Sequence, residues 1–311
     1  MKNKICDIFK IQYPIIQAGM IWASGWRLAS AAANSGCLGL IGAGSMHPET
    51  LIEHIRKCKR NTDKPFGVNV PMLYPDIEKI MNIIVEEEVK IVFTSAGNPK
   101  TWTSWLKKHD IKVVHVVASM KFAKKSEDAG VDAVVAEGFE AGGHNGKEET
   151  TTMCLIPMVR EEIKIPLIAA GGIATGKQML AAMVLGADGV QIGTRFAASL
   201  ESSCHDNFKK RITEVNEGDT ILTLKKIGPV RLIKNKFAEQ VQNAEDSGAT
   251  SDDFKILLGQ GRAKKGMFEG NLEEGELEIG QASAMIREIK PVKEIVEEII
   301  AEYEKAKEKI Y

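Results

Sequence analysis

The pentapeptide Glu140-Ala141-Gly142-Gly143-His144 places a histidine on a glycine-rich loop, directly after the apolar run Asp132–Ala136. A histidine imidazole gains and loses its proton near neutral pH, so it can move a proton or stabilise a negative oxygen. The two glycines allow a ligand to approach the backbone closely. The same pattern also suits a histidine that only closes a turn by binding a carbonyl. The pentapeptide alone supports both interpretations equally.

Short apolar or β-branched runs that look like buried strands recur through the first two thirds of the chain. Successive runs begin about 20 to 35 residues apart, which leaves room for one helix and two loops. Eight such repeats predict an α/β fold, a closed (β/α)8 TIM barrel of parallel strands, with an open doubly wound sheet as the alternative. The runs are Pro14–Gln17, Leu38–Ile41, Phe66–Val70, Ile91–Thr94, Val113–Val117, Ala133–Ala136, Leu167–Ala170 and Gly189–Ile192.

The pattern changes after Phe196. Residues 206–280 are charged and lack further buried-strand runs, which predicts an inserted, mainly helical cap domain. The barrel is then expected to consist of residues 1–205 plus 281–311.

The last segment, Pro291–Ile310, is strongly amphipathic. We expect it to return to the barrel as its closing helix. A coiled coil that binds a partner is the less favoured alternative, because the apolar repeat covers fewer than about three heptads.

Reactive groups of a (β/α)8 enzyme lie at the carboxyl ends of its strands, so we expect the candidate site residues directly after each run. Ala170-Gly171-Gly172-Ile173 follows the seventh run and Gly193-Thr194-Arg195 follows the eighth. Loops at these two places commonly bind a phosphate through backbone N–H groups. The tandem therefore predicts a ligand that carries a phosphate, although the glycines could also serve only to make tight turns.

Several of these segments together resemble the superfamily of nitronate monooxygenases (2-nitropropane dioxygenase-like) and enoyl-acyl-carrier-protein reductases II. The match runs through nearly the whole chain. Members of this superfamily are FMN-binding (β/α)8 barrels with an inserted cap. The segments are Ala18-Gly19-Met20, Phe66-Gly67-Val68-Asn69, Ala96-Gly97-Asn98-Pro99, Glu137-Gly138-Phe139 with the histidine loop, Ala169-Ala170-Gly171-Gly172-Ile173, Gly193-Thr194-Arg195-Phe196 and Gly280-Gln281-Ala282-Ser283.

The resemblance implies a role for individual residues. It implies that His144 is the catalytic histidine over the flavin face, with Gly142 and Gly143 admitting the ring. It implies that the FMN phosphate is held by Gly171, Gly172, Gly193 and Thr194. It further implies that the ribityl chain and ring are lined by Gly19, Met20, Asn69 and Glu137, and that Gln281 closes over the flavin from the cap side.

Two reactions use the same parts. In an enoyl reductase, hydride reaches the β-carbon of an unsaturated thioester, and His144 meets the charge on the carbonyl oxygen or supplies a proton. In a nitronate monooxygenase, His144 holds the nitro group of an anionic substrate or acts as a base. Resemblance to the reductases at Ala96-Gly97-Asn98-Pro99, Met20-Ile21-Trp22 and Gly280-Gln281 favours an enoyl-acyl-carrier-protein reductase. A flavin-binding protein without turnover is the alternative from another class.

A reductase of this kind needs an electron donor and a substrate. The electron donor is NADH or NADPH, bound transiently, because no GxGxxG element opens a helix after a strand. The substrate is a small molecule or is bound to acyl carrier protein, and the family suggests a homodimer. A formal net charge of −1 gives no field that would hold nucleic acid or an anionic membrane.

The cysteines indicate a reducing compartment. All five are scattered and none forms a CxxC pair, so we expect free thiols and no zinc or other metal site. Cys37 and Cys154 have apolar sequence neighbours and are expected to be buried packing residues. His115 interrupts the fifth run and is expected to be a satisfied core or rim histidine. With neither a signal peptide nor a membrane span in the sequence, we expect a soluble cytoplasmic protein.

Overall fold

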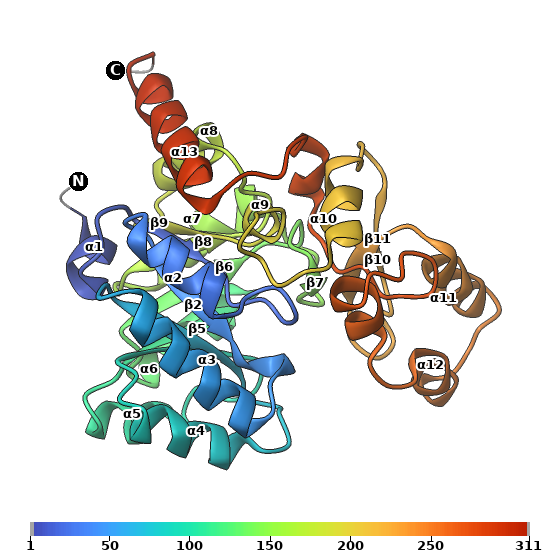
Figure 1. Ribbon diagram of the computed structural model, residues 1–311, viewed down its shortest axis with the longest axis horizontal. Helices are drawn as coiled ribbons and strands as arrows, with labels where there is room; N and C mark the ends of the chain where they lie inside the picture. Colours follow the sequence, from blue (N-terminus) through green and yellow to red (C-terminus); the bar gives the residue numbers. More distant parts are fainter. Residues whose placement is uncertain (1–2, 310–311) are drawn as a thin grey trace.

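The apolar runs form one closed parallel barrel in the computed structural model, which describes residues 3–309 (Figure 1). The first strand pairs with its neighbours on both sides: Ile16 lies opposite Leu38 of the second strand and opposite Gln191 of the last. This closure confirms the predicted (β/α)8 barrel and excludes the open sheet. The barrel strands are β1 Ile15–Gln17, β2 Leu38–Gly42, β3 Phe66–Pro71, β4 Ile91–Ser95, β5 Lys112–Val117, β6 Ala133–Glu137, β8 Leu167–Ala170 and β9 Gly189–Ile192.

Amphipathic helices cover the outside of the barrel. The last of them, α13 (Val292–Lys307), packs against α8 and α2 and closes the helical ring, as predicted, although the predicted end at Ile310 lies outside the described residues. None of the described helices is long and apolar enough to cross a membrane. The other helices of the ring are α2 Trp26–Asn34, α3 Pro48–Asn61, α4 Ile77–Glu86, α5 Thr103–Lys108, α6 Met120–Asp128, α7 Thr152–Glu162 and α8 Gly176–Val184.

Side chains fill the interior of the barrel. Alternate residues of the strands, among them Leu40, Phe93 and Val135, point inward and are buried. The short helix α1 (Lys4–Phe9) belongs to the same cluster, since Phe9 is 1% exposed and its ring centroid lies 6.0 Å from that of Phe93. The barrel is therefore a packed core that leaves only the carboxyl ends of its strands free for chemistry.

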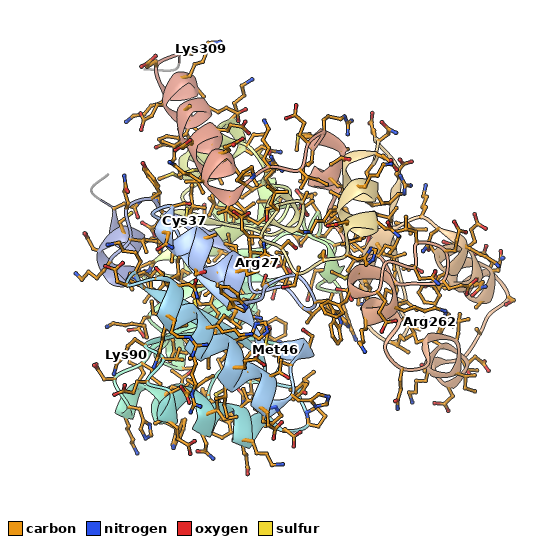
Figure 2. The ribbon with its side chains drawn as sticks, viewed as in Figure 1. Arg27, Cys37, Met46, Lys90, Arg262 and Lys309 are labelled. Carbon is orange, nitrogen blue, oxygen red and sulfur yellow. The ribbon has the colours of Figure 1, made fainter. Side chains whose placement is uncertain are left out.

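The cap lies beside the barrel (Figure 1), and Figure 2 shows Arg262 there, across the view from Lys90 at the start of β4. Its own core includes Phe237, Val241 and Phe254. The cap elements are α10 Asp206–Thr213, β10 Thr220–Thr223, β11 Val230–Ile233, α11 Lys236–Asp246, α12 Ser251–Leu258 and the π-helix η2 Lys264–Phe268, followed by the 3-10 helix η3 Gln281–Met285.

The expectation that no buried strand follows the barrel is wrong. All four residues of β11 are buried, and β11 pairs antiparallel with β10 and with a strand of the barrel loop, β7 (Gly143–His144). Arg231 stands in the middle of β11 and breaks what would otherwise be an apolar run. Because this charged side chain interrupts the apolar run, the sequence pattern did not predict the strand.

Two single-residue expectations have opposite outcomes. His115 is 4% exposed, and its Nδ1 lies 2.7 Å from the Thr94 hydroxyl, so it is the satisfied core histidine that was predicted. Cys37 is buried as expected, but Cys154 is exposed on α7. The prediction for Cys154 is wrong because its apolar sequence neighbours do not all face the barrel: Met153 is 63% exposed.

The packing of α1 predicts a large loss of stability on truncation of Phe9. Phe9→Ala should lower the free energy of unfolding by about 3 to 5 kcal/mol, because a ring that closes the barrel interior leaves a cavity. Urea unfolding followed by circular dichroism measures this loss. Phe122→Ala is the matched control, because Phe122 is 46% exposed and should cost less than about 0.5 kcal/mol. Equal effects of the two substitutions would contradict the role of α1.

Candidate active site

The loops after β1 and β9 meet β3 at the carboxyl face of the barrel. Asn69 of β3 donates a side-chain hydrogen bond to Gly19 O over 3.1 Å. A Cβ atom at Gly19 would lie 2.3 Å from Asn69 Cβ, so this approach requires glycine. Met20 lies beside the loop after β9, because a Cβ atom at Gly193 would lie 3.3 Å from its Sδ. Four predicted site residues thus share one region.

The loops after β8 and β9 present backbone donors. Gly171 and Gly172 have φ of 90° and 69°, which favours glycine. Among the described residues, no protein acceptor binds the backbone N–H groups of Gly171, Gly172, Ile173 or Gly193. The short helix α9 (Thr194–Ala197) begins next to them, and its first N–H groups lack helical partners. This donor set fits a phosphate group.

The return from the cap to the barrel crosses the histidine loop. Gln281 N donates to Glu140 O over 2.9 Å, and Gly280 N donates to Thr194 Oγ1 over 3.2 Å. A Cβ atom at Gly142 would lie 2.5 Å from Gly280 N. The predicted residues Gly142, Thr194 and Gln281 are therefore brought together, at the point where cap and barrel meet.

His144 faces a cavity between the barrel and the cap. It is exposed and pairs, as part of β7, with Val230 of β11. The cavity has a volume of about 300 Å³. Its apolar lining comes from both domains and consists of Ile21, Trp22, Leu224, Ile227, Val230, Leu258 and Ala263. The histidine thus lies at the wall of a largely apolar space.

Arg231 holds the histidine loop to the cap, and the sequence pattern did not single it out. It is 3% exposed, and its Nε and Nη2 donate to Phe139 O over 3.1 and 3.0 Å. Its guanidinium also lies 5.0 Å from the centroid of the Phe139 ring, and its backbone pairs with Gly143. A charged residue inside an apolar run, as in Val230–Ile233, was the available signal.

Three glutamates of this region have raised pKa values. Glu137, at the end of β6, is half-buried, and burial raises its pKa to about 7. Burial also raises the pKa of Glu276 and of Glu278 to about 7, and for Glu276 the neighbouring Glu278 adds to the effect. Only Glu137 was predicted. The alternation Glu276-Leu277-Glu278-Ile279, typical of a strand with one buried face, could have revealed the other two.

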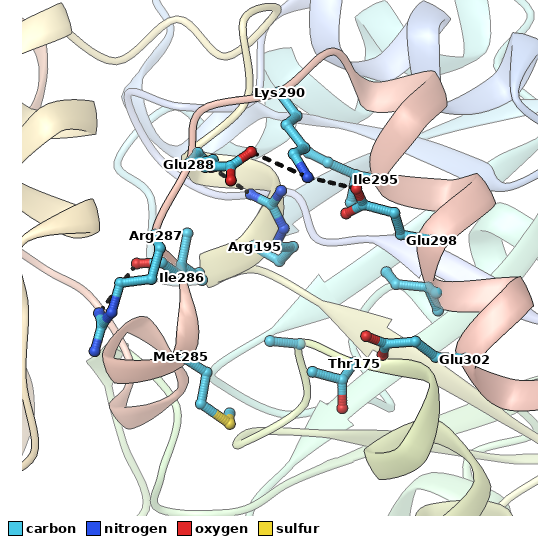
Figure 3. A pocket seen from close by; sticks show the side chains of 12 residues that line it. Thr175, Arg195, Met285, Ile286, Arg287, Glu288, Lys290, Ile295, Glu298 and Glu302 are labelled. Carbon is cyan, nitrogen blue, oxygen red and sulfur yellow. Dashed lines mark hydrogen bonds and ion pairs between the residues drawn. The ribbon is translucent and has the colours of Figure 1, made fainter. Parts of the chain in front are cut away.

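A second cavity, of about 220 Å³, lies between the start of α8, η3 and α13 (Figure 3). Arg195 donates to Glu288 O over 3.2 Å there, and Lys290 pairs with Glu288 over 3.1 Å and with Glu298. Glu302 accepts the N–H of Gly176 over 2.9 Å. These charged groups bind one another or the backbone and connect α13 to the barrel, so we assign this cavity a structural role.

The close approach at Gly142 gives a prediction for stability. Gly142→Ala should lower the free energy of unfolding by about 1 to 3 kcal/mol, because the new Cβ meets backbone that must shift. At Gly193→Ala the tightest contact of the new Cβ is with the flexible side chain of Met20, and Ala18 Cβ lies at an ordinary 3.7 Å, so this change should cost less than about 1 kcal/mol. Urea unfolding of both variants checks the difference, and a larger loss for Gly193→Ala would contradict the described loop crossing.

The raised pKa of Glu137 gives a prediction for pH dependence. The folded state holds this proton above the ordinary pKa of 4.5, up to about 7, so the free energy of unfolding should fall as pH rises through this window. Glu137→Gln should flatten that fall, whereas Glu161→Gln on exposed α7 surface should leave it unchanged. Urea unfolding from about pH 4.5 to about pH 8 measures it. A steeper fall in Glu137→Gln would show that the sign is wrong.

Comparison with known proteins identifies the family. The family model for nitronate monooxygenase matches residues 2–81 and 73–302. A probable nitronate monooxygenase of Staphylococcus saprophyticus is 31% identical, over 92% of this chain and 94% of its own length. The (3aS,4S,5R,7aS)-5-hydroxy-7a-methyl-1-oxo-octahydro-1H-indene-4-carboxyl-CoA dehydrogenase of Rhodococcus jostii is 28% identical, over 97% of this chain and 96% of its own length.

A solved structure agrees over the whole molecule. FabK from Thermotoga maritima is 40% identical, with a TM-score of 0.95, and the match covers 100% of this chain and 98% of that one. The barrel, the cap and the loops between them are therefore shared features. The chain belongs to the nitronate monooxygenase family, whose members are flavin-dependent oxidoreductases.

Proposed function

We propose that this protein is an FMN-dependent enoyl-acyl-carrier-protein reductase of type II. The observation that carries the proposal is the likeness to FabK, an enoyl-acyl-carrier-protein reductase II, at 40% identity over the full chain. The relative that acts on a carboxyl-CoA thioester supports the same class of substrate. The apolar cavity beside His144 suits the acyl chain of such a thioester.

The donor set at the strand ends supports FMN as the cofactor. The free N–H groups of Gly171, Gly172 and Gly193, with the start of α9 at Thr194, would bind its phosphate. The residues that would line the ribityl chain and ring are Gly19, Met20, Asn69, Glu137, Gly142 and Gly143, with Gln281 on the cap side. When bound, FMN supplies the hydride transfer that no side chain of this chain can perform.

His144 would be the polar catalytic group. Its place on the cavity wall allows it to donate a hydrogen bond to the thioester oxygen, where negative charge builds up during reduction. Arg231 and the pairing of β7 with β11 hold the loop that carries it. NADH or NADPH would be the transient electron donor and acyl carrier protein the carrier of the substrate. A homodimer is part of the same proposal.

Nitronate monooxygenase activity is the second candidate, because the relatives with that name share about a third of their residues with this chain. In that reaction His144 would hold the anionic nitro group. Both candidates place the substrate in the same cavity, so substrate choice separates them.

Steady-state assays test the proposal. NADH or NADPH oxidation should be rapid with a crotonyl thioester, and oxygen uptake should be absent with alkyl nitronates or propionate-3-nitronate. His144→Ala should lower turnover on the order of 10²-fold while the protein keeps its flavin absorbance. His109→Ala is the control, because His109 lies on α5's exposed end, stacked on Trp105. Turnover with nitronates alone would overturn the proposal in favour of the oxygenase, and unchanged turnover in His144→Ala would refute the role of the histidine.

A further inference from the structure

Two carboxylates line the cavity beside His144. Glu276 and Glu278 lie two residues apart in the extended segment before η3, so their side chains share one face. The backbone of Glu278 bridges to Leu232 of β11, on the edge that β7 also pairs with. A Cβ atom at Gly143 would lie 2.5 Å from Glu278 Oε2, which brings this carboxylate against the histidine loop.

Neither carboxylate forms an ion pair among the described residues, although the charges of His144 and Arg262 oppose the rise in the pKa of Glu276. Glu276 is only 8% exposed, and Glu278 is half-buried. Among residues 3–309, no hydrogen bond or ion pair involves either side chain. Their oxygens are open to the cavity, since no buried side-chain oxygen of the described residues lacks a partner. Burying an unpaired carboxylate is unfavourable, so its persistence on a cavity wall needs a functional reason.

The cations near the pair are engaged elsewhere. Arg262 donates to the backbone oxygens of Leu258 and Glu274 and pairs with the Glu274 carboxylate. Lys264 pairs with Glu269 over 3.3 Å. Of the basic side chains among the described residues that line the cavity, this leaves His144 as the one without a hydrogen bond or ion pair to another side chain. The local charge of the cavity is therefore set mainly by the two carboxylates.

We propose that Glu276 and Glu278 form an acid pair that makes this cavity select an uncharged acyl substrate over an anionic one. The inference rests on the proposed function, since it takes the cavity to be the substrate site. An enoyl thioester is neutral around its reacting carbons and meets no repulsion there. A nitronate or a free carboxylate is an anion and is repelled by the like charges of the pair. The pair would thus favour the reductase substrate over the oxygenase substrate.

The selection should depend on pH. Burial raises the pKa of both carboxyl groups to about 7, and for Glu276 the charge of Glu278 adds to the rise. Below this pH the pair keeps protons and carries less charge, so an anion is tolerated. As pH rises through about 7, the pair becomes negative and anions are excluded.

Binding of two matched probes tests the proposal without requiring turnover. The probes are trans-2-octenamide, which is neutral, and trans-2-octenoate, which has nearly the same shape and is an anion. Their dissociation constants are measured on the flavin-loaded protein from the quenching of tryptophan fluorescence, because Trp22 lines the cavity. At about pH 8.5 the amide should bind on the order of tenfold more tightly, and the ratio should fall toward one at about pH 6.

The double variant Glu276→Gln/Glu278→Gln should bind octenoate on the order of tenfold more tightly than the wild type at about pH 8.5, with amide binding unchanged. Glu273→Gln, an exposed carboxylate on the same segment, is the control and should keep the wild-type ratio. A wild-type ratio that does not change with pH, or equal ratios in the wild type and the double variant, would overturn the proposal. Absence of crotonyl-thioester turnover would refute the reductase instead and would leave the binding ratio as it is.

Discussion

The site depends on one contact, the pairing of the histidine loop of the barrel with the cap. Gly143 and His144 form a strand with Val230 and Arg231, and Glu140 O accepts a hydrogen bond from the returning chain at Gln281. The loop is thereby held from two sides by a domain that comes later in the sequence. Without the cap, the loop would keep only its barrel-side contacts, among them those of Asn145 Nδ2 with Ala141 O and Gly143 O and that of Thr152 N with the Glu140 carboxylate. The histidine loop belongs to the barrel, and its contacts with the cap help to fix its position.

The two sides of the site differ in charge. Toward the loops after β8 and β9, backbone N–H groups that have no acceptor among residues 3–309 favour an anion such as a phosphate. Toward the cap, Glu276 and Glu278 disfavour an anion and leave room for apolar groups. The two regions meet at Gly280, whose N donates to Thr194 Oγ1 and lies against Gly142 of the histidine loop. An anionic cofactor end and an uncharged substrate can therefore occupy neighbouring parts of one site without competing for the same contacts.

The barrel could be predicted from the sequence because parallel strands are buried on both faces and read as apolar runs, as Leu167–Ala170 and Ala133–Glu137 do. The loops that carry the candidate site residues could be predicted because each of them directly follows one of those runs. The cap was harder, because its strand Val230–Ile233 contains a buried arginine whose partners, Phe139 O and the Phe139 ring, are nearly a hundred residues away. The alternation at Glu276 and Glu278 indicates an extended segment, but their place beside His144, more than a hundred residues earlier, is set by the fold. The prediction for Cys154 was wrong for a different reason. Its neighbours in the sequence are apolar, but the fold leaves its side chain exposed.

We propose that this site takes electrons from a nicotinamide donor and delivers them to a neutral acyl substrate. The most direct test is the anaerobic bleaching of the flavin absorbance of the purified protein. Our account predicts that NADH or NADPH bleaches the flavin and that a crotonyl thioester then restores its colour. Bleaching by an alkyl nitronate, with none by either nicotinamide, would contradict the account.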